Sequence, residues 1–117
     1  MNKRALGAKY EALAASWLEG QGHRILVRNF RSRTGEIDLV ALDERGDRPV
    51  LVFVEVKYRN TRTSGYAEEA VDAKKQMSIR RTADFYRVRY QVADSVPCRF
   101  DVIAFQNGRL RHIENAF

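Results

Sequence analysis

Two apolar runs of the chain carry charged residues, which is unusual for strands that otherwise look buried. Residues 35–42 and 51–57 are rich in Val, Leu, Ile and Phe, and a polar stretch with one Gly and one Pro separates them. This pattern predicts a β-hairpin. Side chains alternate between the two faces of a strand, so the pairing register decides which charges meet. We expect the register that pairs Leu42 with Leu51.

That register gathers the charges at one end of one face. It sets Asp38 opposite Glu55 and Glu36 opposite Lys57. A slip of one residue would place Asp38 and Glu55 on opposite faces, so the preferred register is the one that sorts polar from apolar positions. The reverse face is then wholly apolar, with Ile37, Leu39, Ala41, Val52, Val54 and Val56.

Opposed carboxylates on one face need a compensating charge. Paired Cβ atoms lie about 5 Å apart, and two carboxylates at roughly that distance repel by about 3 kcal/mol at an effective dielectric near 20. Lys57 offsets part of this repulsion. A divalent cation offsets more, and Mg²⁺ or Mn²⁺ selects oxygen ligands. The pattern therefore indicates a metal site held by Asp38, Glu55 and the backbone carbonyl of Val56, with Lys57 orienting water or neutralising phosphate charge.

The alternative interpretation is a surface hairpin with cross-strand ion pairs, of which Glu36 with Lys57 would be one. The spacing of Asp38, Glu55 and Lys57 is loose and common by itself. Apolar residues on both sides of every charge favour the metal site, because an exposed strand would alternate charged and apolar residues throughout.

Two helices are predicted outside this hairpin. The first ends near Gly20 and Gly22, and its expected core stripe is Leu6, Tyr10, Leu13, Ala14, Trp17 and Leu18. Glu11 lies one position off that stripe, where a solvated residue is the plain alternative to a functional one. The second helix is capped by Asp72 and runs to about residue 88.

Alternation predicts three further strands, and a turn signal joins the last two. Asn107-Gly108 is the hairpin turn, and Asp101 within an apolar run is expected to pair with an arginine. The strands are residues 23–30, 99–105 and 110–113, with a polar bend at residues 29–34.

The order of elements is therefore α-β-β-β-α-β-β, an α/β sandwich with a central mixed sheet between helices. A length of 117 residues predicts a single domain, 1–117. Cys98 is the only cysteine, which excludes an internal disulfide and a thiolate zinc site. His23 and His112 stand apart in the sequence and are expected to be structural or surface residues. The apolar runs are shorter than a membrane span and no signal-peptide core follows the first residues, so we expect a cytoplasmic protein.

The net charge of +6 favours a polyanionic partner. Lys75 and Gln76 fall in the first turn of the second helix, near the end that favours anions. Basic residues also crowd beside the hairpin, and those with Lys75 and Gln76 are the expected nucleic-acid contacts: Arg31, Arg33, Arg59 and Arg62. A merely solvated basic surface is the alternative.

The hairpin block resembles the YraN-like family of small bacterial proteins. The residues that carry the resemblance are 35–41 and 53–59, supported by 7–12, 22–31, 71–76 and 99–102. The family is similar to archaeal Holliday-junction resolvases and implies a restriction-endonuclease-like fold. It also implies a metal-dependent nuclease triad at Asp38, Glu55 and Lys57, with an auxiliary helix carboxylate at Glu11. Ile37 stands where the broader nuclease motif has proline.

These observations predict a Mg²⁺- or Mn²⁺-dependent nuclease acting on DNA, with branched or otherwise structured DNA as a candidate substrate. The alternatives are a nucleic-acid-binding module that keeps the nuclease fold without cleaving, and a scaffold for protein partners. A crowded acidic pair favours the nuclease, because unmetallated carboxylates would repel a polyanion. The resolvase likeness also suggests a homodimer, which would cut two strands symmetrically.

Overall fold

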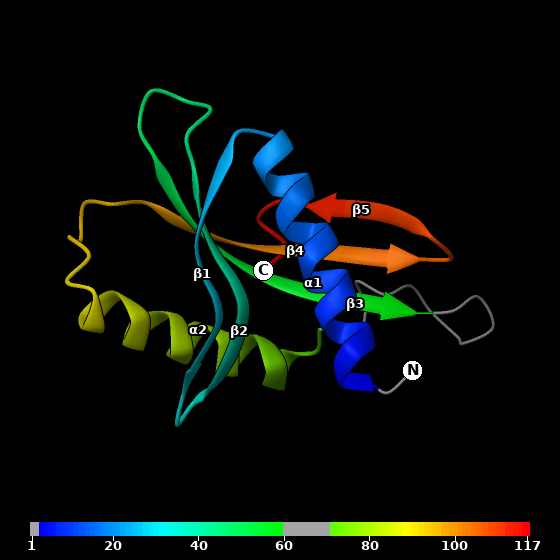
Figure 1. Ribbon diagram of the computed structural model, residues 1–117. Helices are drawn as coiled ribbons and strands as arrows, with labels where there is room; N and C mark the ends of the chain where they lie inside the picture. The colour runs from blue at the N-terminus through cyan, green and yellow to red at the C-terminus, as the bar shows by residue number, and fades with distance from the viewer. Residues whose placement is uncertain (1–2, 60–70) are drawn as a thin grey trace.

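Within the part of the chain that the structure describes, five strands form one mixed sheet with a helix on each face (Figure 1). A computed structural model of the protein describes residues 3–59 and 71–117. The predicted order α-β-β-β-α-β-β is confirmed. The elements are α1 (Lys3–Gly20), β1 (His23–Ser32), β2 (Gly35–Asp43), β3 (Val50–Arg59), α2 (Ala73–Arg89), β4 (Cys98–Gln106) and β5 (Arg109–Ile113).

The strands lie in the order β1-β2-β3-β4-β5. Strands β3 and β4 are parallel and are connected through α2, as a parallel pair requires a crossover. The other neighbours are antiparallel. Leu42 pairs with Leu51, so the predicted register of the central hairpin is confirmed.

Helix α1 covers one face of the sheet with small side chains. Ala14, Ala15 and Leu18 are fully buried there, against residues such as Val52 and Ile103. The predicted stripe was partly wrong, because Leu13 and Trp17 are 45% and 38% exposed. Small residues let a helix approach the sheet closely, so the helix is rotated toward its alanines. By helical spacing Glu11 belongs to this sheet-facing side, four residues before Ala15.

Helix α2 covers the opposite face with larger side chains. Asp72 caps it as predicted, since its carboxylate accepts the Lys75 N–H at 2.8 Å. Tyr86 is buried edge-on against Phe30 and Phe53, with ring centroids 5.1 and 5.6 Å away. This aromatic cluster fixes α2 over β1 and β3.

The β1–β2 hairpin changes which face it buries near Asn29, which has a positive φ of 54°. Beyond this point Phe30 and Ile37 join the core beneath α2. Leu39 packs instead in the core beneath α1, so the prediction that Ile37 shares a face with Leu39 was wrong.

The predicted bend at residues 29–34 was also wrong. Pairing continues to Ser32 with Gly35, so only Arg33 and Thr34 form the turn. No helix within residues 3–59 and 71–117 has both the length and the apolarity that a membrane crossing demands. The cytoplasmic location stays a prediction.

Candidate functional site

Asp38 lies where β2 and β3 separate. The β2–β3 ladder ends at Leu39 paired with Val54. Asp38 is the residue before Leu39 on β2, and its carboxylate accepts a hydrogen bond from the backbone N–H of Val56 at 2.8 Å. A side chain thus takes the place of a ladder hydrogen bond, and this contact orients Asp38 between the two strands. The structure brings the Val56 peptide to the site as predicted, although the role of its carbonyl as a ligand stays a prediction.

Glu55 is buried beside Asp38 with one carboxylate oxygen unpartnered. The residue is 5% exposed. Its Oε1 lies 3.3 Å from Lys57 Nζ and 4.0 Å from Lys75 Nζ. Its Oε2 is buried without a hydrogen-bond partner among the described residues. A buried, charged oxygen without a partner is costly, which distinguishes this group from an ordinary structural ion pair.

Burial raises the pKa of both carboxyl groups. Desolvation and the neighbouring Asp38 raise the pKa of Glu55 to about 7, and Lys57 and Lys75 oppose this only in part. Desolvation also raises the pKa of Asp38, against the Val56 N–H that lowers it. Without an added cation, the ionised form of each carboxyl group is therefore destabilised. Two adjacent carboxylates and an unpartnered oxygen are a donor set that fits Mg²⁺ or Mn²⁺.

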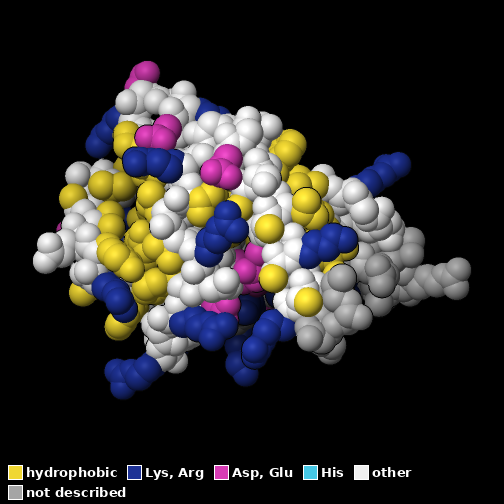
Figure 2. All heavy atoms as spheres, in the orientation of Figure 1, with side chains coloured by type: hydrophobic (Ala, Val, Ile, Leu, Met, Phe, Trp, Pro, Cys, Tyr) yellow, Lys and Arg dark blue, Asp and Glu magenta, His cyan; other side chains and the backbone are white. Residues whose placement is uncertain are grey.

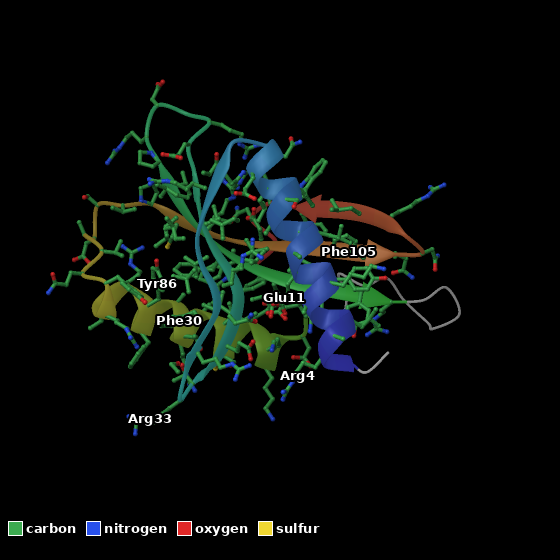
Figure 3. The ribbon with its side chains drawn as sticks, in the orientation of Figure 1. Arg4, Glu11, Phe30, Arg33, Tyr86 and Phe105 are labelled. Carbon is green, nitrogen blue, oxygen red and sulfur yellow. The ribbon has the colours of Figure 1, made fainter. Side chains whose placement is uncertain are left out.

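Glu11 approaches the same region from α1. It lines a cavity of about 270 Å³ with Arg4, Gly7, Ala8 and Asn29. Figure 3 labels Arg4 and Glu11 on the N-terminal part of α1. Burial and then Asp38 raise the pKa of Glu11, while a hydrogen bond from the Asn29 side chain lowers it. Asn29 is a residue that sequence analysis missed, and its signal is the three-residue step from Val27 to Phe30 that breaks strand alternation.

Glu11 does not complete a three-carboxylate centre. Within the described parts of the chain, no three His, Cys, Asp or Glu side chains come together as a metal-holding group. Asp38 and Glu55 would therefore be the protein's side-chain ligands, and backbone, water or substrate oxygens would complete the coordination.

The ion pair between Glu36 and Lys57, which the alternative interpretation required, is replaced by two others among the described residues. Glu36 lies 3.4 Å from Arg31, and Lys57 turns to Glu55. The strands have already diverged at this point, so Glu36 no longer faces Lys57. Glu36 still raises the pKa of Asp38 by its charge, which places it at the margin of the site.

The structure brings some of the remaining predicted contacts to the carboxylates but not others. Lys75 faces Glu55 directly, and Arg59 ends β3 two residues after Lys57. Gln76 uses its side-chain amide to donate to the Val71 carbonyl at 3.1 Å, so it holds the entry of α2. Arg33 lies at the β1–β2 turn. Arg62 lies outside the described residues.

The comparison with known proteins decides the family. Residues 10–105 match the family described as "Uncharacterised protein family UPF0102". The chain belongs to this family. The predicted YraN-like resemblance is thereby confirmed.

Relatives in UPF0102 align over nearly the whole chain. A UPF0102 protein of Lachnoclostridium phytofermentans is 47% identical and covers 100% of this chain and 96% of its own. One from Symbiobacterium thermophilum is 45% identical, with 97% of each chain covered. One from Persephonella marina is 41% identical, with 95% of this chain and 91% of its own covered. The family is shared over the full fold rather than over the hairpin alone.

A second polar group, which we call the charge-paired cluster, was not predicted. It contains His23, Asp43, Arg99, Asp101 and His112 from four different strands. Asp101 is fully buried and accepts from Arg99 at 2.9 and 3.1 Å, from His112 at 2.7 Å and from the Asn115 N–H at 3.0 Å. The expected pairing of Asp101 with an arginine is confirmed.

The charge-paired cluster keeps its carboxylates ionised. Arg45 and Arg99 hold the pKa of Asp43 well below its usual range. Hydrogen bonds from His112 and Arg99 outweigh burial and lower the pKa of Asp101. His23 and His112 are structural as expected, but they do not stand apart, since their rings are 5.9 Å from centroid to centroid. Their sequence separation gives no signal of this contact.

Proposed function

We propose that the chain is a metal-dependent nuclease that hydrolyses phosphodiester bonds in DNA at Asp38 and Glu55. The observation that carries this proposal is Glu55 Oε2, which is buried beside a second carboxylate and has no hydrogen-bond partner among the described residues. Ion pairing alone does not account for that oxygen. A hard divalent cation does, and DNA is the polyanion that a net charge of +6 favours.

Asp38 and Glu55 would hold a Mg²⁺ or Mn²⁺ ion. When bound, such an ion supplies Lewis-acid stabilisation of phosphate charge and lowers the pKa of a water. Asp38 is oriented for this role by the Val56 N–H. Lys57, 3.3 Å from Glu55 Oε1 and with 27% of its side chain exposed, can reach both the carboxylate and a substrate in solvent. We assign Lys57 to donating hydrogen bonds to the attacking water and to the scissile phosphate.

The surface around the carboxylates supports a phosphate-bearing substrate. Figure 2 shows acidic side chains in a recess that is bordered by Lys and Arg side chains. Lys75 and Lys57 point at the recess, and Arg31 and Arg59 lie on β1 and β3. An acidic centre with a basic border attracts a phosphate backbone while it reserves the centre for a cation.

The decisive experiment is a cleavage screen with purified protein. Linear, flapped and four-way DNA are incubated with Mg²⁺, with Mn²⁺ and with a chelator, and products are resolved on denaturing gels. We expect cleavage with either ion, none with chelator and none with Asp38→Asn, while exposed Asp94→Asn cleaves like the parent. DNA binding without cleavage under every condition would instead favour the nucleic-acid-binding module.

A metal titration tests the ligand assignment without any substrate. An ion that binds only the folded state stabilises it by about 2.7 kcal/mol at one hundred times its dissociation constant. The melting temperature of the parent and of Asp94→Asn should therefore rise with Mn²⁺. Asp38→Asn should stay folded without this rise, and an equal rise in that variant would show that the ion binds elsewhere.

The homodimer belongs to the same proposal. Symmetric cleavage of two strands requires two sites related by a twofold axis. Light scattering with and without four-way DNA measures the state directly, and a monomer on junction DNA would restrict the enzyme to cutting one strand at a time.

A further inference from the structure

A second basic recess lies between the β1–β2 turn and α2. Its volume is about 430 Å³, and it is lined by Arg33, Thr34, Lys74, Met77, Ser78 and Arg81. Figure 3 shows Arg33 at the tip of the hairpin, away from Glu11. Neither Asp38 nor Glu55 lines this recess, so it is separate from the carboxylates.

The turn and the helix are fixed to each other by hydroxyl groups. Ser78 Oγ donates to the Thr34 carbonyl at 2.6 Å. The Thr34 and Thr82 hydroxyls are 2.8 Å apart, and Thr82 is fully buried. Gly35, with a φ of 146°, sits so close to α2 that a Cβ there would overlap Ser78 Oγ. The walls of the recess are therefore held in place before any ligand arrives.

The basic residues of α2 that line the recess lie on one side of the helix. Lys74, Ser78 and Arg81 are spaced by four and three residues, which places them on one side of α2. Arg33 closes the recess from the turn. Lys75, the next residue after Lys74, points instead at Glu55. One turn of α2 thus borders both the recess and the carboxylates.

The three cations of the recess have no acidic partner among the described residues. Arg33, Lys74 and Arg81 form no ion pair with any carboxylate in residues 3–59 and 71–117. Several other arginines are paired, for example Arg24 with Glu44 and Arg99 with Asp101. Three converging, unpaired positive charges on a rigid wall form a site for an anion.

We propose that this recess binds a backbone phosphate of the DNA, other than the phosphate that is cleaved. The inference rests on the proposed function, since the ligand is a second phosphate of the same substrate. It makes the β1–β2 turn a substrate clamp. It also specifies the substrate class, because a second phosphate exists only in a polynucleotide that extends beyond the scissile bond.

The test compares DNA binding by single-charge variants in chelator, where cleavage does not interfere. Arg33→Gln, Lys74→Gln and Arg81→Gln each remove one cation from the recess. Arg48→Gln removes the same charge from the exposed loop between β2 and β3, beyond the end of β2 that is remote from the turn. We expect each recess variant to bind several-fold more weakly than Arg48→Gln, with the slope of log affinity against log salt reduced by about 1.

A second measurement locates the anion without DNA. Inorganic phosphate is titrated into the ¹⁵N-labelled full chain, and the amide signals of Arg33, Lys74 and Ser78 should move in the parent and in Arg48→Gln but not in Arg33→Gln. If the parent binds DNA and all three recess variants match Arg48→Gln in affinity and slope, the second phosphate site is wrong while the nuclease proposal stands. If the parent binds no DNA at low salt, the proposed function itself fails.

Discussion

The sheet carries two groups of buried carboxylates with opposite electrostatics. In the charge-paired cluster, Asp101 receives four hydrogen bonds and its pKa is lowered. Where β2 and β3 separate, one Glu55 oxygen lies 3.3 Å from Lys57 Nζ, and the other has no hydrogen-bond partner among the described residues. The pKa of Glu55 is raised to about 7. Asp101 pairs with Val54, the residue before Glu55, so the two carboxylates belong to adjacent positions of the sheet.

The two groups differ in how far neighbouring cations and hydrogen-bond donors compensate the charge of their carboxylates. Arg99 bridges Asp43 and Asp101, and Arg45 adds a second guanidinium at Asp43, so both carboxylates are paired, although His23 Nδ1 is buried without a hydrogen-bond partner among the described residues. Among the described residues, the cations that pair with Glu55 are two lysine ammonium groups, at 3.3 and 4.0 Å from one of its oxygens. Carboxylates that are fully paired stabilise the fold, whereas a buried carboxylate that is paired only in part is explained by a ligand that is added later.

The largest expected effect is the loss of Asp101. Asp101→Asn removes the charge that Arg99 and His112 share, so it should lower the free energy of unfolding at pH 7 by about 3–5 kcal/mol. Because the folded pKa of Asp101 lies below its unfolded value, this stability is present above about pH 4 and is lost as the pH falls through the folded pKa. Urea denaturation at pH 7 and pH 3 measures both. Asp94→Asn is the control, and an equal effect there would remove the distinction.

The second effect concerns rate rather than stability. Lys57→Ala should lower single-turnover cleavage by about a hundredfold or more, because a donor to the developing phosphate charge is lost. Metal binding should persist, since Lys57 is no ligand. Calorimetry with Mn²⁺ and quenched-flow cleavage separate the two quantities, with exposed Lys9→Ala as the control. Cleavage at the parent rate would make Lys57 a structural partner of Glu55, like Arg99 in the charge-paired cluster.

The third effect has the opposite sign to the first. The pKa of Glu55 is raised above its unfolded value, so ionising this group costs folding stability as the pH rises from about 4.5 through 7. Glu55→Gln should therefore raise the free energy of unfolding by about 1–3 kcal/mol at pH 8 in chelator, and by little at pH 4.5. Chemical denaturation at both pH values tests this. Destabilisation at pH 8 would show that Glu55 is an ordinary buried ion pair.

The fold and the carboxylate pair were predictable mainly from the alternation of polar and apolar residues along the strands. The Leu42–Leu51 register follows from sorting polar and apolar residues, and it brings Asp38 to Glu55 without any knowledge of the rest of the chain. The Asp72 cap and the Asn107-Gly108 turn depend only on local chemistry. These features are set by residues that are near one another in sequence or directly paired.

The features that sequence analysis missed depend on tertiary packing. The alanines of α1 rotate that helix so that Leu13 and Trp17 are exposed and Glu11 turns toward the strands. The charge-paired cluster joins His23 to His112 across the folded sheet, which no spacing reveals. The β2–β3 ladder ends before Glu36, so the partner of Glu36 is Arg31 on β1 rather than Lys57.

The smallest effect tests that last change. Glu36 lies on the diverged part of β2, with 37% of its side chain exposed and its carboxylate 3.4 Å from an Arg31 side chain that is 75% exposed. Exposed pairs of this kind contribute about 0–1 kcal/mol, so Glu36→Gln should shift the free energy of unfolding by less than about 1 kcal/mol. Its charge also raises the pKa of Asp38, so the substitution should lower that pKa and slightly ease ionisation of the site. Cleavage should stay within a few-fold of the parent in the single-turnover assay used for Lys57→Ala. A hundredfold loss would place Glu36 among the metal ligands, and the boundary of the site would then extend along β2 beyond Asp38.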